Sequence, residues 1–375
     1  MKTIRTKTLK ILFYLIPEIE SRENLDKTIS NFLEMVYHLQ IIQEDFDWTS
    51  WEEGKQILQN SDKGFDKYDI DTLCKLITAI VRNDKFNENY LESKFTDGTI
   101  FKIIKAMENK NKTLFEFLEE RISDKIQVYE YEHVKLKKTL TFNGLFNAYE
   151  NYEWNGIKKE ETTENLNRLK VDIVSNKKTA YEEILKWGNV YSKWNKIKLE
   201  KVFKEGEKKY FERVSRIVSR FNINQPFKEF KEAWDADVIK GEIFMNSGFT
   251  KIYSLYFDDF VIYDSRVGAA LAFFVNEYIE KGGELAKDDR HRFSIPPSRD
   301  NKRRNPEGRF NIIGQDPAKF FYNNLVANHL IKSVLENTKS DFKNINSVSE
   351  RMRALEMALF MIGYDVKKIK ENYNK

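Results

Sequence analysis

Glycine and proline are scarce in this chain, and their scarcity limits the folds that are open to it. The 375 residues include 15 glycines and 6 prolines, well below the roughly 7% and 5% of average proteins. Sheet-rich folds need frequent tight turns, and phosphate-binding loops need clustered glycines. The sequence contains neither GxGxxG nor GxxxxGK[ST]. We therefore predict a mainly α-helical protein without a glycine-rich nucleotide loop.

Aromatic residues supply much of the predicted core. They make up 14% of the chain, with 28 Phe, 18 Tyr and 6 Trp, although hydrophobic residues as a whole reach only 41%. Rings bury a large apolar area per residue, so a chain of this composition folds rather than staying disordered. The net charge of +4 comes from 63 basic and 59 acidic residues, and so small a total does not indicate a partner by itself.

Metal and membrane chemistry are not expected. The single cysteine, Cys74, cannot form an internal disulfide or a four-cysteine cluster. The four histidines are scattered and form no HExxH motif. No apolar run approaches the ~18 residues that span a bilayer, and acidic residues follow the basic N-terminus where a signal cleavage site would lie. We expect a cytoplasmic protein without a metal, a cofactor or a membrane partner.

Two regions are expected, with a boundary near residue 138. Residues 1–138 show helical periodicity, as at Phe32 and Val36, which lie one helical turn apart. Segment 126–140 instead alternates apolar and polar residues, which indicates a strand or a small β-hairpin. Residues 139–375 return to helical patterns and form the second region.

The stretch with the strongest chemical signal is 244–274. A polar turn that ends at Gly248 opens a short apolar helix, which starts near Thr250 and Lys251. An apolar extended run then ends at Asp264, where a second helix begins. An aspartate at a helix N-cap accepts backbone N–H bonds and is kept ionised by the helix dipole. Such a carboxylate is either a structural cap alone or also a stabiliser of a developing cation in a pocket.

This stretch resembles the helix-hairpin-helix DNA glycosylases, and the 8-oxoguanine glycosylase branch is the most similar. The resemblance rests on Gly248 in the turn, Lys251 at the start of the next helix, and Asp264 in the apolar-Asp-x-x-Val context Ile262-Tyr263-Asp264-Ser265-Arg266-Val267. It covers about 30 of the 375 residues. The turn has one glycine and no proline, and Lys251 precedes Asp264 by 13 residues, a shorter spacing than is usual in the family.

The resemblance implies a glycosylase-like helical domain, with an added helical N-terminal region, that acts as a monomer on double-stranded DNA with a flipped base. Asp264 would stabilise the oxocarbenium-like transition state as the N-glycosidic bond breaks, and Lys251 would be the nucleophile of a bifunctional lyase. Main-chain amides of the hairpin would grip the DNA backbone, which places Ser247, Gly248, Thr250 and Arg266 at the DNA. The base would be damaged or modified. In a member of this superfamily that acts in bacterial defence against phages, the base would be a modified cytosine of phage DNA.

Two further groups of residues complete the predicted site. Segment 287–309 contains eight basic residues and three of the six prolines, so it is expected to be a loop that either neutralises DNA phosphates or is merely solvated. Its tightest basic cluster is Arg299, Lys302, Arg303 and Arg304. A flipped base needs aromatic walls, and the rings expected there are Trp187, Tyr191 and Tyr253, with Trp154 and Trp194 as further candidates in a chain whose rings are mostly core.

Asn324 and Asn328 share one face of a predicted helix, because they lie four residues apart. Such a pair either reads a base edge or cross-links helices, and we favour the structural role.

Two other classes of function remain open from the sequence. A catalytically inactive protein of the same fold would bind DNA or a partner protein without chemistry. Alternatively, residues 1–130 would form a protein-interaction module that controls an enzyme.

Overall fold

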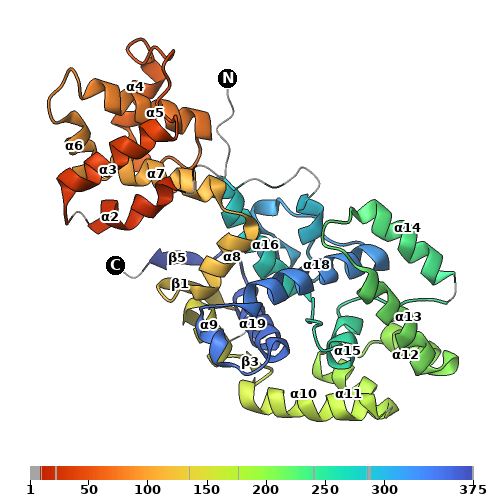
Figure 1. Cartoon of the computed structure of the whole chain (residues 1–375). Helices are drawn as coiled ribbons and strands as arrows, with labels where there is room; N and C mark the ends of the chain where they lie inside the picture. The colour runs from red at the N-terminus through yellow and green to blue at the C-terminus, as the bar shows by residue number, and fades with distance from the viewer. Residues whose placement is uncertain are drawn as a thin grey trace. The chain divides into compact units, whose positions relative to one another are not determined.

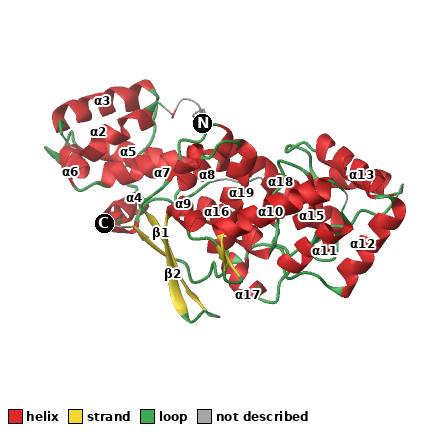
Figure 2. Ribbon diagram, turned by 90° about the horizontal axis from the view of Figure 1, so that it is seen from below, coloured by secondary structure: helices red, strands yellow, loops and turns green. Residues whose placement is uncertain are grey.

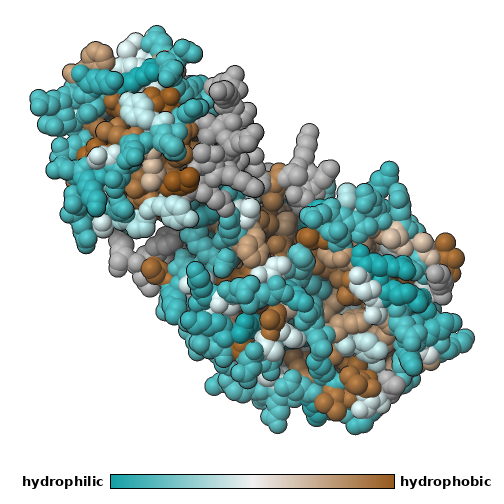
Figure 3. Space-filling model, in the orientation of Figure 1, coloured by the Kyte–Doolittle hydropathy of each residue, from teal (hydrophilic) through white to brown (hydrophobic). Residues whose placement is uncertain are grey.

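The chain is mainly α-helical, as its composition predicts (Figures 1 and 2). The computed structural model describes residues 9, 11–21, 23–134, 136–175, 177–239, 241–283, 285 and 289–373. These residues form two compact units, one of residues 1–117 with 277–284 and one of residues 118–276 with 285–375. On the face that Figure 3 shows, the surface is mostly hydrophilic. None of the described helices is both long and apolar enough to cross a membrane.

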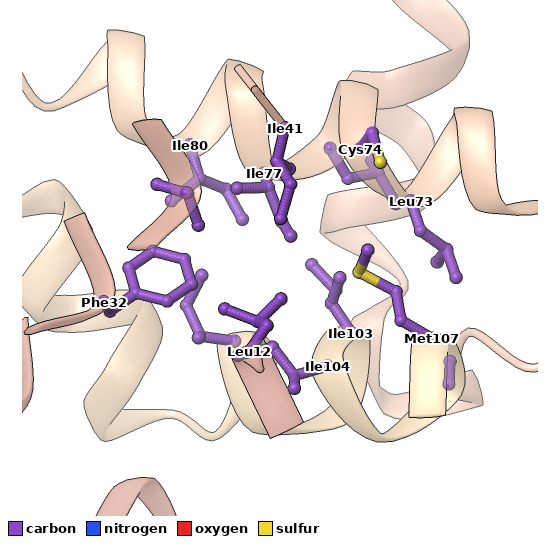
Figure 4. Close-up of a cluster of buried hydrophobic side chains, with 14 of the residues drawn as sticks. Leu12, Phe32, Ile41, Leu73, Cys74, Ile77, Ile80, Ile103, Ile104 and Met107 are labelled. Atoms are coloured by element: carbon purple, nitrogen blue, oxygen red, sulfur yellow. The ribbon is translucent and has the colours of Figure 1, made fainter. Parts of the chain in front are cut away.

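The first unit is a small helical bundle around an aliphatic core. Its elements are η1 (Leu12–Leu15), α2 (Ile16–Ser21), α3 (Leu25–His38), α4 (Glu52–Gln59), η2 (Ser61–Lys63), α5 (Ile70–Asn83), α6 (Tyr90–Thr96) and α7 (Thr99–Asn111). Leu12, Phe32, Ile77 and Ile103 meet at its centre (Figure 4). The predicted helical periodicity thus corresponds to the buried faces of α3, α5 and α7.

The compact units divide at residue 117, earlier than the boundary expected at residue 138. Helix α8 (Leu114–Ser123) spans the division, and the strands that follow it belong to the second unit. Segment 126–140, whose alternating pattern suggested a boundary, therefore lies near the start of the second unit.

The predicted β-hairpin is present in the second unit. Strand β1 (Gln127–His133) pairs antiparallel with β2 (Lys138–Asn143), with Tyr131 opposite Leu140. A third strand, β5 (Lys370–Tyr373), pairs with the other edge of β1. This strand was not predicted from the sequence, because its four residues show no alternation of apolar and polar side chains.

The rest of the second unit is helical. It consists of α9 (Gly144–Glu150), the short ladder β3 (Glu153–Trp154) with β4 (Ile157–Lys158), α10 (Lys159–Val174), α11 (Lys178–Trp187), α12 (Lys193–Glu205), α13 (Glu207–Arg220), α14 (Phe227–Val238), α15 (Phe249–Tyr256), α16 (Ser265–Glu280), α18 (Pro317–Glu336), η5 (Asp341–Asn344) and α19 (Val348–Ile362). Helix α19 packs against α9 and α18, and α15 packs against α10 and α11. Hydrogen bonds from the Ile262 N–H to Glu356 and from Arg353 to the Ser254 carbonyl place the 244–274 stretch next to α19.

The segment predicted as a basic loop contains three short helical turns within its described part. They are η3 (Asp289–Phe293), α17 (Asn301–Arg304) and η4 (Pro306–Gly308). Ile295, within the segment, forms a parallel bridge with Ile312, which lies three residues beyond its end. Lys287, the first basic residue of the predicted loop, lies outside the described residues.

Candidate active site

Lys251 lies in the first turn of α15 and is buried, with 4% of its surface exposed. The side chain of Asn246 caps this helix, because its Oδ1 accepts the N–H groups of Gly248 (2.8 Å) and Phe249 (3.1 Å). An ammonium group at this position loses most of its hydration.

Asp264 caps α16, as the sequence predicts. Its Oδ1 accepts the backbone N–H groups of Arg266 (2.9 Å) and Val267 (3.2 Å). Because the cap uses only Oδ1, the second carboxylate oxygen is left for other interactions. The structural role of this aspartate is therefore compatible with a chemical one.

Three buried side chains fix the extended segment that leads into α16. Oδ1 of Asn328 accepts the N–H of Val261 (2.9 Å), and Nδ2 of Asn324 donates to the carbonyl of the same residue (3.1 Å). Oε2 of Glu356 accepts the N–H of Ile262 (2.6 Å). These contacts confirm the structural role predicted for the two asparagines, although they link α18 to an extended segment rather than to another helix.

Lys251 and Asp264 face each other. Nζ of Lys251 lies 3.9 Å from Oδ2 of Asp264 and donates a hydrogen bond to the carbonyl of Ser247 (3.0 Å). Burial lowers the pKa of the Lys251 ammonium below its usual value near 10.5, although the carboxylates of Asp264 and Glu356 oppose the shift. A lysine with a lowered pKa supplies the neutral, nucleophilic amine at a lower pH.

Both side chains line one cavity of about 270 Å³ in the second unit. This volume is close to the ~300 Å³ lower end of small-molecule pockets, so it suits one small ring system. The rest of the lining is a wall of aromatic and apolar residues together with several polar groups. The apolar and aromatic lining residues are Tyr152, Trp154, Trp187, Gly188, Val190, Ile262, Val267, Pro297, Met357 and Phe360, and the other polar ones are Asn189, Ser247, Ser265, Arg266, Arg304 and Glu356.

Gly188 leaves the space through which Lys251 extends. A Cβ atom at this position would overlap Cδ and Cε of the lysine. The backbone of Gly188, which ends α11, has φ −73°, so the role of this glycine is to leave space rather than to permit an unusual conformation. The sequence analysis missed this residue; its signal was a glycine directly after Trp187 in a glycine-poor chain.

Glu356 is a second acidic residue of the cavity that the sequence analysis missed. It is buried on α19 and accepts a hydrogen bond from the Arg353 guanidinium (2.6 Å). Burial raises the pKa of the Glu356 carboxyl above its usual value, against the opposing charge of Arg353. The available signal was one acidic residue within the apolar run 354–362, where a charge is uncommon unless it is paired.

Arg266 orders the aromatic wall of the cavity. Its guanidinium carbon lies 4.2 Å from the ring centre of Phe360, 5.0 Å from that of Tyr364 and 5.1 Å from that of Trp154. Nε1 of Trp154 donates to the carbonyl of Trp187 (2.9 Å). These cation–π and hydrogen-bond contacts hold the two indoles beside the cavity. Arg266, predicted to contact DNA, thus also has a role inside the protein.

The turn residues predicted to grip the DNA backbone are largely engaged within the protein. Gly248 and Thr250 are buried. The amides of Gly248 and Phe249 donate to Asn246, and Oγ1 of Thr250 donates to the carbonyl of Ser247 (3.1 Å). Ser247 is partly exposed and lines the cavity. This corrects the prediction that Gly248 and Thr250 form a phosphate-binding turn, because the Asn246 side chain accepts the Gly248 amide and the Asn246 backbone carbonyl accepts that of Thr250.

Three of the four clustered basic residues remain at the surface. Arg299 and Lys302 are exposed. Arg303 is partly exposed and lies 3.5 Å from the Asp300 carboxylate. Their positions leave them accessible to a polyanion.

Arg304 is different, because it is buried in the cavity wall. Its guanidinium donates to Oγ of Ser265 and lies 3.6 Å from Asp300. This corrects the prediction of a surface phosphate contact: the side chain joins α17 to the start of α16.

Of the three rings predicted to wall the base pocket, Trp187 lines the cavity and the two tyrosines do not. Tyr253 is fully buried, and its hydroxyl lies 2.7 Å from that of Tyr210. The hydroxyl of Tyr191 donates to Glu182 (3.0 Å). The two tyrosine assignments were wrong for different reasons: Tyr253 fills the core, whereas Tyr191 is partly exposed and its hydroxyl is held by Glu182.

Comparison with known proteins gives one match. Residues 17–113 match the sequence model of a protein family described as "Family of unknown function (DUF6508)". This range lies within the first unit and covers 97 of the 375 residues. No curated protein and no solved structure matches the chain. The second unit, which contains the cavity, is therefore interpreted from its own geometry.

Proposed function

We propose that the second unit is a DNA base-excision enzyme with a helix-hairpin-helix glycosylase-like fold, which cleaves the N-glycosidic bond of an extruded base. The observation that supports this most is the placement of Lys251 and Asp264 in one ring-lined cavity, with 3.9 Å between Nζ and Oδ2. The two residues come from the starts of two successive helices, as the resemblance implies.

Asp264 has the properties needed to stabilise the transition state. Breaking an N-glycosidic bond leaves positive charge on C1′ and the ring oxygen of the deoxyribose, and a fixed carboxylate stabilises that charge. The two N–H bonds to Oδ1 hold the carboxylate in place, and Oδ2 faces the cavity beside Lys251. Little reorganisation is then needed as the charge develops.

Lys251 has the properties of the nucleophile. The lone pair of its neutral amine forms a bond to C1′ while the bond from C1′ to the base nitrogen breaks and leaves its electron pair on the base. The proton lost from Nζ passes through Asp264 or solvent to the departing base. The nitrogen lone pair then breaks the bond from C1′ to O4′, which takes up a proton, and an imine forms between Nζ and C1′. Removal of a C2′ proton by a base forms a double bond between C2′ and C3′ while the 3′ phosphate leaves with its electron pair, which cleaves the strand.

The cavity matches a single base in size and lining. Its volume of about 270 Å³ admits one small ring system. Trp154, Trp187 and Phe360 supply aromatic rings to its lining, and Glu356 supplies a polar group to the same lining. Extrusion of a base costs a few kcal/mol, least for a damaged or mismatched one. We therefore propose damaged or modified bases as substrates, including the modified cytosines of phage DNA.

The test is base release from a panel of DNAs. The protein is incubated with oligonucleotides that contain 8-oxoguanine, uracil, alkylated bases or hypermodified cytosines, and with modified phage genomes, and abasic sites are then cleaved with alkali. We expect breaks with at least one substrate, lost in Asp264→Asn and retained in Asp259→Asn, whose carboxylate pairs with Lys332. Absence of breaks with every substrate, or breaks that persist in Asp264→Asn, would overturn the proposal.

A second measurement separates the two mechanisms. Sodium borohydride reduces an imine and traps the enzyme on DNA covalently. We expect trapping by the wild-type protein and by Lys228→Ala, which alters an exposed lysine, and no trapping by Lys251→Ala. Base release that survives in Lys251→Ala would instead identify water as the nucleophile.

A further inference from the structure

Trp194 is exposed to an extent that is unusual for tryptophan. It is the second residue of α12, and 71% of its surface is accessible. Among the described residues, no ring or cation contact involves this side chain. An indole left in water exposes a large apolar area without compensation in the folded chain.

The helix that presents Trp194 is basic. Its exposed residues are four lysines, one glutamate and the tryptophan, namely Lys193, Trp194, Lys196, Glu200, Lys201 and Lys204. Helices α12 and α13 together contain ten basic and four acidic residues, a net charge of +6 where the whole chain has +4. Lys201 pairs with Glu242 (2.7 Å). Within the described residues, the ammonium groups of Lys193, Lys196 and Lys204 form no ion pair.

The first turn of α12 is joined to the rim of the cavity. Nδ2 of Asn195 donates to the carbonyl of Val190 (2.8 Å), and its Oδ1 accepts from Nδ2 of Asn246 (2.8 Å). Val190 lines the cavity, and Asn246 caps the helix that contains Lys251. Trp194 is therefore the residue directly before Asn195, whose side chain links Val190 in the cavity lining to Asn246 at the start of α15.

We propose that this face of α12, with Trp194 and the exposed lysines, is a nucleic-acid docking surface that recognises an unpaired base next to the cavity. The inference rests on the proposed function, and it identifies the preferred substrate as DNA with an unpaired nucleotide rather than intact duplex. A basic surface with an exposed ring is the combination that binds unpaired nucleotides, since lysines neutralise phosphates and the ring stacks on a base of any sequence. This docking surface does not include Arg299 or Lys302 of the predicted basic loop.

The expected effects differ between the ring and the charges. Stacking on an aromatic side chain changes affinity by roughly tenfold or more per base, and it requires a base that is free of its partner. Phosphate neutralisation acts on all DNAs alike and adds roughly 0.9 to the salt slope of binding for each contact to duplex. The Trp194 ring thus provides the preference for unpaired nucleotides, and the lysines provide affinity for DNA of any kind.

The experiment measures binding of three labelled oligonucleotides by fluorescence anisotropy: an intact duplex, the same duplex with one unpaired nucleotide, and a single strand. Wild-type protein is expected to bind the last two at least tenfold more tightly than the intact duplex. Trp194→Ala is expected to lose this preference, and Trp194→Phe to retain most of it. Lys193→Gln with Lys196→Gln is expected to weaken the binding of all three oligonucleotides and to lower the salt slope by roughly 1.8 for the duplexes and roughly 1.4 for the single strand. Lys228→Gln on α14 is expected to change neither the affinity nor the salt slope.

The outcomes separate this inference from the proposed function. If Trp194→Ala keeps the preference for unpaired nucleotides, or if the lysine pair leaves the salt slope unchanged, the docking surface is wrong even where base release is intact. If Trp194-dependent binding is found but no base is released from any substrate, the enzymatic proposal is wrong and the docking surface remains. Trp194 and both lysines are exposed, so thermal unfolding of these variants should match that of the wild type. If Trp194→Ala unfolds at a lower midpoint, Trp194→Leu, which keeps an apolar side chain but has no ring, replaces it and is likewise expected to lose the preference.

Discussion

Gly188 lies directly beside the aliphatic part of Lys251, so that a Cβ atom at position 188 would overlap both Cδ and Cε of the lysine. The two residues are 63 positions apart in the chain. The end of α11 therefore shapes the path along which the side chain of α15 reaches Asp264.

We expect Gly188→Ala to lower the rate of borohydride trapping by tenfold or more. The added methyl group must move the lysine, and misplacement of a reacting group by about 1 Å can cost on the order of 100-fold in rate. Because φ at this position is −73°, alanine fits the backbone, and we expect the unfolding free energy to change by less than about 1 kcal/mol. Gly314→Ala is the control, since a Cβ there meets no atom within 4 Å. Wild-type trapping by Gly188→Ala would refute the positioning role.

The pH dependence of trapping should report the buried amine. The neutral fraction of Lys251 grows as pH rises through its pKa, so the rate should rise with pH and level off below the usual lysine value near 10.5. The negative charge of Asp264 raises this pKa, so on DNA with a preformed abasic site, where no base has to be released, Asp264→Asn should shift the midpoint to lower pH. Single-turnover trapping over about pH 6 to 10 measures both effects. A midpoint at or above 10.5 would contradict the buried position of the amine.

The capping and chemical roles of Asp264 should separate in two variants. Asparagine caps a helix about as well as aspartate, whereas alanine costs about 0.5–2 kcal/mol. Both substitutions remove the charge beside Lys251, so the difference between them isolates the cap. We expect Asp264→Ala to unfold in urea about 1 kcal/mol more easily than Asp264→Asn, with base release lost in both. Equal stability would show that the N–H bonds to Oδ1 do not hold α16.

Much of the fold could be predicted because its signals are local. Helical periodicity indicated the buried faces of α3 and α5, and apolar alternation indicated the hairpin of β1 and β2. Strand β5 was missed because four polar residues reveal their partner only in three dimensions. The unit boundary was displaced for the same reason, since contacts rather than pattern assign the hairpin to the second unit.

The candidate site was predictable only where chemistry coincides with a local signal. Lys251 and Asp264 stand at helix starts, which the turn residues before them reveal. Glu356 reaches the cavity from α19, 92 residues after Asp264, and no local pattern records that contact. Arg299 and Arg304 look alike in sequence, yet one is exposed and the other is buried against Ser265, because burial depends on how α17 packs.

Glu356 should be essential to the stability of the cavity wall. It accepts the N–H of Ile262 and the Arg353 guanidinium, each at 2.6 Å, from a buried position. Removing one partner of a buried charged pair typically costs about 3–5 kcal/mol, and the partial exposure of Arg353 places our expectation for Glu356→Ala near the lower end. Glu229→Ala, an exposed residue on α14, is the control in urea unfolding. A loss below about 1 kcal/mol would show that the wall does not depend on this carboxyl.

The contribution of Glu356 to the free energy of unfolding should depend on pH with a definite sign. Burial raises the folded-state pKa of Glu356 above its usual value near 4.5, so between these two values the folded chain binds more protons than the unfolded chain. The stabilisation from the protonated carboxyl is complete below the usual pKa and is lost as pH rises through the raised one. Glu356→Gln has no titrating group here, so wild-type stability relative to this variant should decline from acidic to neutral pH in paired urea titrations. A difference that grows with pH would instead show that the ion pair with Arg353 overcomes the effect of burial.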